Sequence, residues 1–85
     1  MEEREIDQLG VDRFRLAMLE KLAIKRLEGR GGWHDPEQCA VSDLHAMLLD
    51  HVEKGDMVDI ANFAMMIWNR EQSSDTKQEN EYGKR

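Results

Sequence analysis

Residues 57–68, MVDIANFAMMIW, place apolar side chains around nearly the whole circumference of a helix. Asp56 is a good N-cap for this segment, so we predict a helix over residues 56–71. A helix that is apolar all round is expected to be buried all round, and a chain of 85 residues has too few neighbours to cover it. We therefore expect a homo-oligomer, dimeric or higher, with this helix in its interface.

Two other helical patterns precede this segment. Residues 10–28 carry apolar side chains at helical spacing and end at Gly29, where glycine favours a helix stop. Residues 42–54 show a second amphipathic pattern, with Ser42 as its N-cap and Gly55 as its stop. The chain is therefore predicted to be all-α, with about three helices in a compact bundle.

The predicted bundle is a single helical domain over residues 10–71. Residues 1–9 are expected to form an acidic N-terminal arm, and the polar, aperiodic residues 72–85 a disordered tail. Cys39 is the only cysteine, which excludes an internal disulfide, and its expected role is that of a small half-buried apolar residue. A core this small usually needs a partner or a bound ion for support.

The charge distribution and the absence of long apolar runs exclude some classes of function. The net charge is −6, but residues 10–33 are basic and residues 34–59 are acidic, so we expect the two segments to attract each other. The basic segment is short and lacks interleaved aromatic residues, which argues against a nucleic-acid partner. No targeting signal and no membrane-spanning stretch is present, and we expect a cytoplasmic protein with no membrane partner.

Four carboxylates crowd the predicted corner between the second and third helices. They lie within ten residues and would repel one another without a cation. Mg²⁺ and Mn²⁺ favour carboxylate oxygens, so one interpretation is a Mg²⁺ or Mn²⁺ site. The other is a solvated acidic corner in which Asp56 serves only as a helix cap. The predicted metal ligands are Asp50, Glu53, Asp56 and Asp59.

A narrow polar line crosses the apolar third helix at Asp59, Asn62 and Asn69. An ionised aspartate in apolar surroundings is costly unless it is paired or bound to a cation. One interpretation is a ligand site. The alternative is a solvent-facing edge, or an ion pair between Asp59 and a basic residue of the first helix.

Trp33 lies in the glycine-rich loop between the first two helices. A tryptophan in such a loop is expected either to cover the core as a lid or to contact a ligand directly. The histidines lack zinc-ligand spacing, and His51 is expected to border the apolar face of the second helix.

Residues 55–67, GDMVDIANFAMMI, resemble a segment of the MazG-like all-α nucleotide pyrophosphohydrolases, most closely the small phage-type members. In that family an acidic pair spaced ExxD precedes a segment like VANFAMMI. Residues 30–33, RGGW, are similar to the basic-Gly-Gly-Trp turn after the family's first helix, and Lys21-Leu22 fits its KL pair. The resemblance covers about half the chain and is most specific in the third helix.

The resemblance implies a helical protein that dimerises around a metal site and cleaves nucleoside triphosphates to monophosphate and pyrophosphate with Mg²⁺. Asp59 and Asp56, with Asp50 or Glu53, would hold the metal, and Asn62 would contact ligand or water. The other residues implied in nucleotide binding are Lys21, Lys25 and Arg30 for phosphate and Trp33 for the base.

The chain departs from the family pattern in the second helix. Where the family carries EExxE, residues 50–54 read DHVEK, and the stretch between the acidic helices is reduced to one corner. These changes indicate a degenerate member with weaker metal binding. The alternative function is therefore that of a non-enzymatic, phage-type accessory protein that binds a host protein partner through its apolar third helix.

Overall fold

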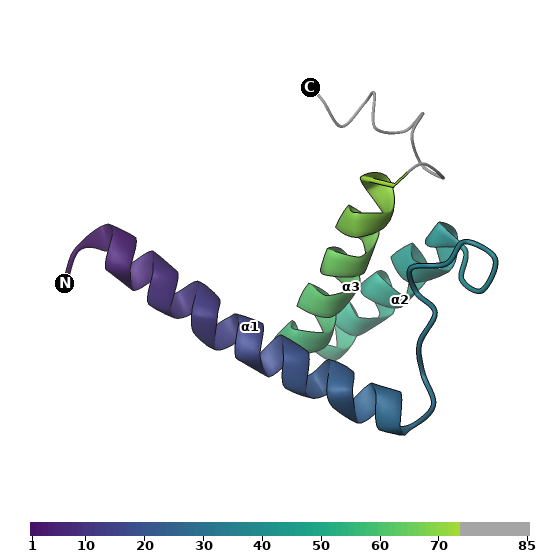
Figure 1. The fold of residues 1–85 in the computed structure, drawn as a ribbon, viewed down its shortest axis with the longest axis horizontal. Helices are drawn as coiled ribbons and strands as arrows, with labels where there is room; N and C mark the ends of the chain where they lie inside the picture. The colour runs from purple at the N-terminus through teal and green to yellow at the C-terminus, as the bar shows by residue number, and fades with distance from the viewer. Residues whose placement is uncertain (74–85) are drawn as a thin grey trace. The chain divides into compact units, whose positions relative to one another are not determined.

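The computed structural model describes residues 1–73 of the chain. This part contains three helices, namely α1 over Glu3–Leu27, α2 over Val41–Lys54 and α3 over Met57–Glu71 (Figure 1). No strand occurs among residues 1–73, which confirms the all-α prediction. Of the predicted tail, Gln72 and Ser73 follow α3 as a turn and a bend, and residues 74–85 lie outside the described residues.

The chain divides into two compact units. The first is Met1–Gly31 and contains α1, and the second is Gly32–Arg85 and contains α2 and α3. The boundary falls in the glycine-rich stretch after α1, where glycine at positive φ turns the backbone. The arrangement of all three helices in one bundle stays a prediction.

Helix α1 begins at Glu3, seven residues before its predicted start, so the expectation of an N-terminal arm over residues 1–9 is wrong for most of that segment. The first turn explains the difference. The Glu2 amide donates to Oε1 of Glu5 at 2.9 Å, and the carboxylates of Glu3 and Glu5 favour the positive end of the helix dipole. Gly10 costs only about 1 kcal/mol relative to alanine, which is too little to end the helix there.

The C-terminal end of α1 is closed by a Schellman motif. The Gly29 amide donates to the Arg26 carbonyl at 2.9 Å, and the Arg30 amide donates to the Lys25 carbonyl at 3.0 Å. Gly29 has a φ of +89°, a conformation that other residues adopt only at a cost. The predicted stop at Gly29 is confirmed.

Helices α2 and α3 form an antiparallel hairpin joined by a tight corner (Figure 1). Gly55 ends α2 in the left-handed region, at φ 80° and ψ 15°, as predicted. Asp56 then caps α3, because its carboxylate accepts the amides of Val58 and Asp59. Ser42 is not the N-cap of α2: the helix begins at Val41 after Ala40, and no side chain caps it.

The core of the hairpin is small. The buried apolar side chains of the described residues are Leu44 from α2 and Met66 and Ile67 from α3. Met47 and Val52, two apolar residues of the amphipathic pattern over residues 42–54, are exposed. A core of this size leaves the hairpin dependent on polar contacts as well as on apolar burial.

Two glycine substitutions are expected to act in opposite directions. Gly55→Ala meets no atom within 4 Å but forces a side chain into the left-handed region, which costs about 1–2 kcal/mol. Gly10→Ala also meets no atom within 4 Å and should stabilise α1 by about 1 kcal/mol, because alanine is the better helix former. Urea unfolding followed by far-ultraviolet circular dichroism measures both changes. Equal effects of the two substitutions would contradict the assigned conformations.

Candidate functional site

Helix α3 has three polar residues on its hidden side and an apolar stripe on its exposed side. The Asp59 side chain is 16% exposed, and Asn62 and Arg70 are 4% and 3% exposed. Met57 and Trp68, by contrast, are 61% and 60% exposed. One chain therefore leaves part of this helix exposed, as expected for so small a domain, and its burial within an oligomer stays a prediction.

The predicted polar line on α3 does not form a solvent-facing edge. Asp59 and Asn62 are hidden, whereas Asn69 is exposed and donates through Nδ2 to the Met65 carbonyl of its own helix at 2.9 Å. The solvent-edge interpretation is therefore wrong for Asp59 and Asn62. Asn62 is buried and Asp59 half-buried, and the ligand-site interpretation stays a prediction.

The four predicted metal ligands have separate roles at the hairpin corner. Oδ1 of Asp56 accepts two α3 amides, at 3.0 and 3.1 Å. Oδ2 of Asp50 lies 3.1 Å from Nζ of Lys54 on the same face of α2. Oδ2 of Asp59 lies 3.9 Å from Nε2 of His51, and Glu53 is exposed.

These carboxylates do not gather around a common point within one chain. Among the described residues, no group of three or more His, Cys, Asp or Glu side chains is placed to hold a metal ion. A divalent cation of this kind is expected to take several oxygen ligands at short distances. The side chains at the corner therefore do not fit Mg²⁺ or Mn²⁺ in the single chain, and the predicted metal site stays a prediction.

His51 links the two helices at the corner, a role that the sequence analysis missed. Its Nδ1 lies 2.8 Å from the Met47 carbonyl, and its ring lies 4.9 Å from the Phe63 ring, tilted by 44°. A carbonyl oxygen only accepts, so Nδ1 carries a proton and Nε2 is the nitrogen that faces Asp59. Position in the sequence was the signal that could have predicted this contact, because His51 lies four residues before Gly55 and Asp59 lies four residues after it.

Arg70 fixes the loop between α1 and α2 onto the end of α3. Its buried guanidinium donates through Nη1 to the carbonyls of Trp33 and Cys39, at 2.9 and 2.8 Å. A buried carbonyl needs a donor, and a charged donor forms the stronger bond. The sequence analysis did not single out Arg70, although it shares a helix side with Phe63 and Ile67.

Asp35 organises the same loop from within. Its carboxylate accepts the Glu37 amide at 2.9 Å and Nε2 of Gln38 at 3.1 Å. These two hydrogen bonds, the amide first, lower the pKa of Asp35 below its usual value because they favour the charged form. Gly32 has a φ of +80°, and a side chain there would collide with Gln38. The loop therefore has a defined shape of its own.

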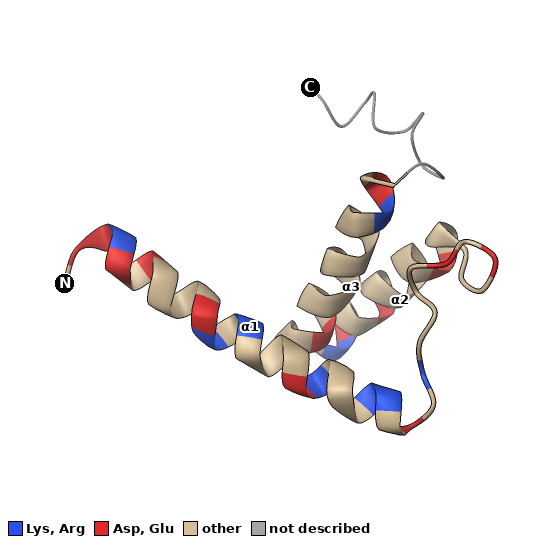
Figure 2. Cartoon of the chain, in the orientation of Figure 1, with Lys and Arg blue, Asp and Glu red and all other residues tan. Residues whose placement is uncertain are grey.

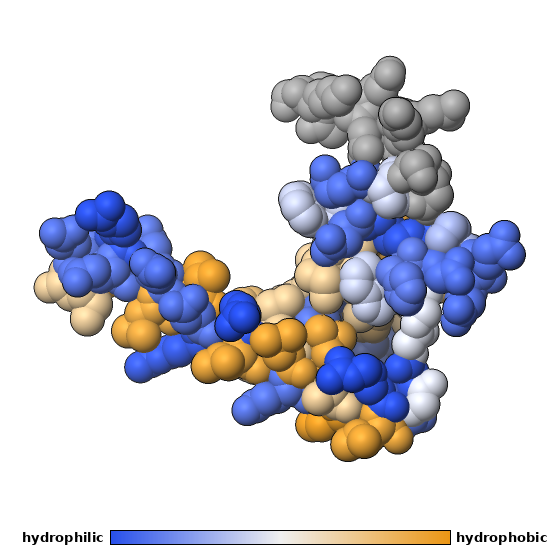
Figure 3. Space-filling model, in the orientation of Figure 1, coloured by the Kyte–Doolittle hydropathy of each residue, from blue (hydrophilic) through white to orange (hydrophobic). Residues whose placement is uncertain are grey.

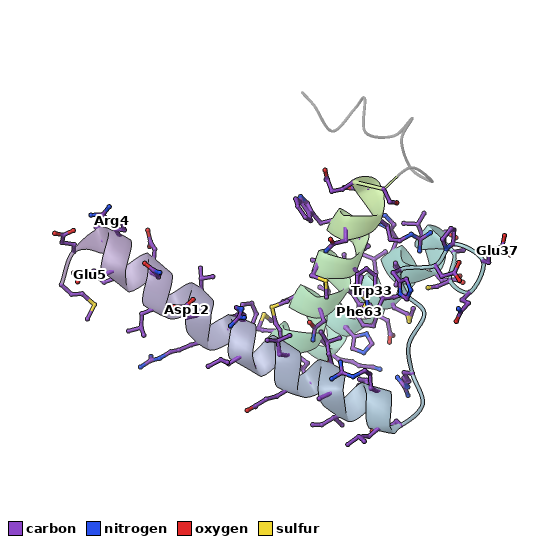
Figure 4. All side chains as sticks on the ribbon, in the orientation of Figure 1. Arg4, Glu5, Asp12, Trp33, Glu37 and Phe63 are labelled. Carbon is purple, nitrogen blue, oxygen red and sulfur yellow. The ribbon has the colours of Figure 1, made fainter. Side chains whose placement is uncertain are left out.

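Trp33 is half-buried and meets the ring of His34 edge-on at 5.9 Å. It lies on the side of the loop toward the hairpin, whereas Glu37 marks the outer edge of the loop (Figure 4). This placement agrees with the lid interpretation for Trp33, and a partly exposed ring leaves room for the ligand interpretation as well.

The predicted phosphate-binding residues all belong to the first unit. Lys21 and Lys25 are half-buried on α1, and Arg30 is exposed just after it. The side chains of Lys25 and Arg30 each lie 3.9 Å from the Glu28 carboxylate, which partly neutralises them. Trp33 and Asn62 belong to the second unit.

Comparison of the chain with protein-family models, with curated proteins and with solved structures finds no match. Within residues 1–73, none of the helices combines the length and the apolar character that a membrane span requires.

Arg70→Met should destabilise the second unit by about 2–4 kcal/mol, because it leaves two loop carbonyls without their charged donor. In a Trp68→Phe background, the remaining emission from Trp33 should also shift to longer wavelength as the loop leaves α3. Urea unfolding and fluorescence measure the two effects. Arg26→Met, which removes an exposed guanidinium, is the control. Equal changes in both variants would contradict the role of Arg70.

Proposed function

We propose that this chain is a non-enzymatic interaction protein that binds another protein through the exposed stripe of α3. The stripe consists of residues that recur every three or four positions opposite the hairpin core, namely Met57, Ala61, Ala64 and Trp68. The observation that supports this proposal is the polarity of α3, in which Asp59, Asn62 and Arg70 are hidden while a tryptophan and a methionine are exposed. Apart from its two ends, α3 is free of charge (Figure 2).

The shape of the stripe favours a helix as the partner. Ala61 and Ala64 are small and lie between the large side chains of Met57 and Trp68, so a second helix has room to approach the backbone between them. Tryptophan and methionine are enriched in protein interfaces, and tryptophan often dominates their energy. The partner that fits is an amphipathic helix of another protein, with its own apolar stripe facing α3.

Site-specific photo-crosslinking tests the proposal. A benzophenone side chain replaces Ala64 in the stripe or, as the control, exposed Ala46 on the opposite side of the hairpin. Irradiation of living cells is expected to give one discrete adduct from position 64 and none of that mass from position 46. The captured protein, once purified, should bind the unmodified chain at least ten times more tightly than it binds the Trp68→Glu variant.

Two results would count against this function. Identical adducts from positions 64 and 46 would mean that the stripe does not bind a specific partner protein. An adduct with twice the mass of the chain would mean that the stripe packs against a second copy, as the sequence analysis expected, and not against a different protein.

A second candidate function is the binding of nucleoside triphosphates, as the resemblance to MazG-like proteins implies. The observation that favours it is the hidden position of Asp59 and Asn62, which the solvent-edge alternative did not expect. The corner carboxylates do not fit a divalent cation by themselves, so the proposal is limited to binding.

Thermal unfolding with a panel of nucleoside triphosphates, with and without Mg²⁺, tests the second candidate. A ligand of the folded state at about one hundred times its Kd adds about 2.7 kcal/mol of stability and so raises the midpoint. Asp59→Ala should abolish that rise, whereas Asp12→Ala, which removes an exposed carboxylate of α1, should leave it unchanged. No rise with any nucleotide at millimolar concentration would exclude this function.

A further inference from the structure

Helix α1 presents an unburied apolar stripe along most of its length. None of the residues in Glu3–Leu27 is buried. Five large apolar side chains on one side of the helix are each between 42% and 89% exposed, and these are Ile6, Leu9, Leu16, Ile24 and Leu27. The space-filling view shows apolar residues at the surface along α1 (Figure 3).

Two opposite charges interrupt the exposed stripe. Arg13 and Glu20 lie on its centre line, seven residues from each other and seven from Ile6 and Leu27 respectively. The residues three and four positions away from either charge are all uncharged, namely Leu9, Gly10, Leu16, Ala17, Ala23 and Ile24. The two charges are about 10 Å apart along the axis, too far to pair with each other. The helix itself therefore offers neither of them an ion pair.

We propose that two copies of this chain associate through α1 in antiparallel orientation. The two-fold axis passes between residues 16 and 17, the point from which Arg13 and Glu20 are equally distant. In this register Arg13 faces the partner's Glu20, and Glu20 faces the partner's Arg13. Ile6 and Leu27 are also equally distant from the axis, so Ile6 of each copy faces Leu27 of the other copy. This proposal rests on α1 alone and is independent of the function proposed for α3.

The sizes of the flanking residues agree with this register. On one flank of the centre line, Gly10 faces the partner's Ile24, and Ala17 meets its own copy at the two-fold axis. A small residue opposite a large one lets two helices approach closely. On the other flank, Leu16 meets its own copy. The register therefore satisfies both the charges and the packing.

The charge of α1 as a whole also selects the antiparallel orientation. Residues 3–12 carry four acids and one base, whereas residues 13–27 carry five bases and one acid (Figure 2). An antiparallel pair lays the acidic half of each helix along the basic half of the other. A parallel pair would oppose Arg13 to Arg13 and Glu20 to Glu20, which is unfavourable.

Sedimentation equilibrium of the full chain and five variants tests the proposal. The unmodified chain is expected to form a dimer that weakens as salt is added, because salt screens the two ion pairs. Arg13→Glu and Glu20→Arg each place like charges across the interface twice and should each raise the dissociation constant at least tenfold. The double variant, Arg13→Glu with Glu20→Arg, restores opposite charges and should dimerise about as well as the unmodified chain.

Mixing the two single variants gives the sharpest result. The Arg13→Glu chain carries acids at both positions and the Glu20→Arg chain carries bases at both, so the two chains have complementary charges whereas each alone opposes like charges. The mixture should therefore form a heterodimer although neither variant dimerises well alone. Arg15→Glu is the matched control, because Arg15 lies off the stripe and the change in net charge is the same. It should change the dissociation constant less than about twofold.

Several outcomes would overturn the proposal. They are a chain that stays monomeric up to millimolar concentration, an equal loss of dimer in Arg15→Glu and Arg13→Glu, and a mixture of single variants that does not associate. A dimer that Trp68→Glu disrupts but Arg13→Glu leaves intact would also overturn it, by placing self-association on α3. Circular dichroism of each variant confirms that the helices are retained.

Discussion

The guanidinium group of Arg70 joins two parts of the second unit that lie far apart in the sequence. It bonds two carbonyls of the loop, those of Trp33 and Cys39, from near the last turn of α3. Removing a charged group from water costs several kcal/mol, and hydrogen bonds to otherwise unsatisfied carbonyls offset that cost. With an apolar core of three side chains, the hairpin has little else to hold the loop in place.

The position of Arg70 also explains the surface of α3. A hairpin of two helices buries only one side of each, and on α3 that side holds Asp59 and Arg70 together with Met66 and Ile67. Polar residues that occupy the hidden side leave apolar residues for the exposed side. The exposed tryptophan is thus a consequence of the contacts that fix the loop and the corner. This relation connects the contacts that hold the fold together to the apolar surface that α3 exposes.

Local signals in the sequence predicted the helices and most of their ends correctly. Gly55 and Asp56 form their capping hydrogen bonds with residues close to them in the sequence. The corner of the hairpin could therefore be predicted from the chemistry of these two residues. The start of α1 was missed because the prediction followed the apolar pattern of residues 10–28, whereas an acidic first turn with a hydrogen bond between Glu2 and Glu5 begins the helix at Glu3. The hidden side of α3 was not predictable from periodicity, since a helix with apolar residues all round has no preferred face. Contacts with other segments determine which side of α3 is hidden. Asp59 contacts His51, eight residues earlier, and Arg70 contacts Trp33, thirty-seven residues earlier.

The order in which the chain is synthesised gives the Arg70 contacts a further consequence. The hairpin corner closes over one glycine and needs only neighbouring residues, whereas the loop contacts span thirty-one and thirty-seven positions. A ribosome makes the loop first and Arg70 more than thirty residues later. During that interval the carbonyls of Trp33 and Cys39 lack their charged donor, whereas the local hydrogen bonds of Asp35 need no residue of α3. The loop can therefore take its own shape early, but it can be fixed onto α3 only after Arg70 has been made.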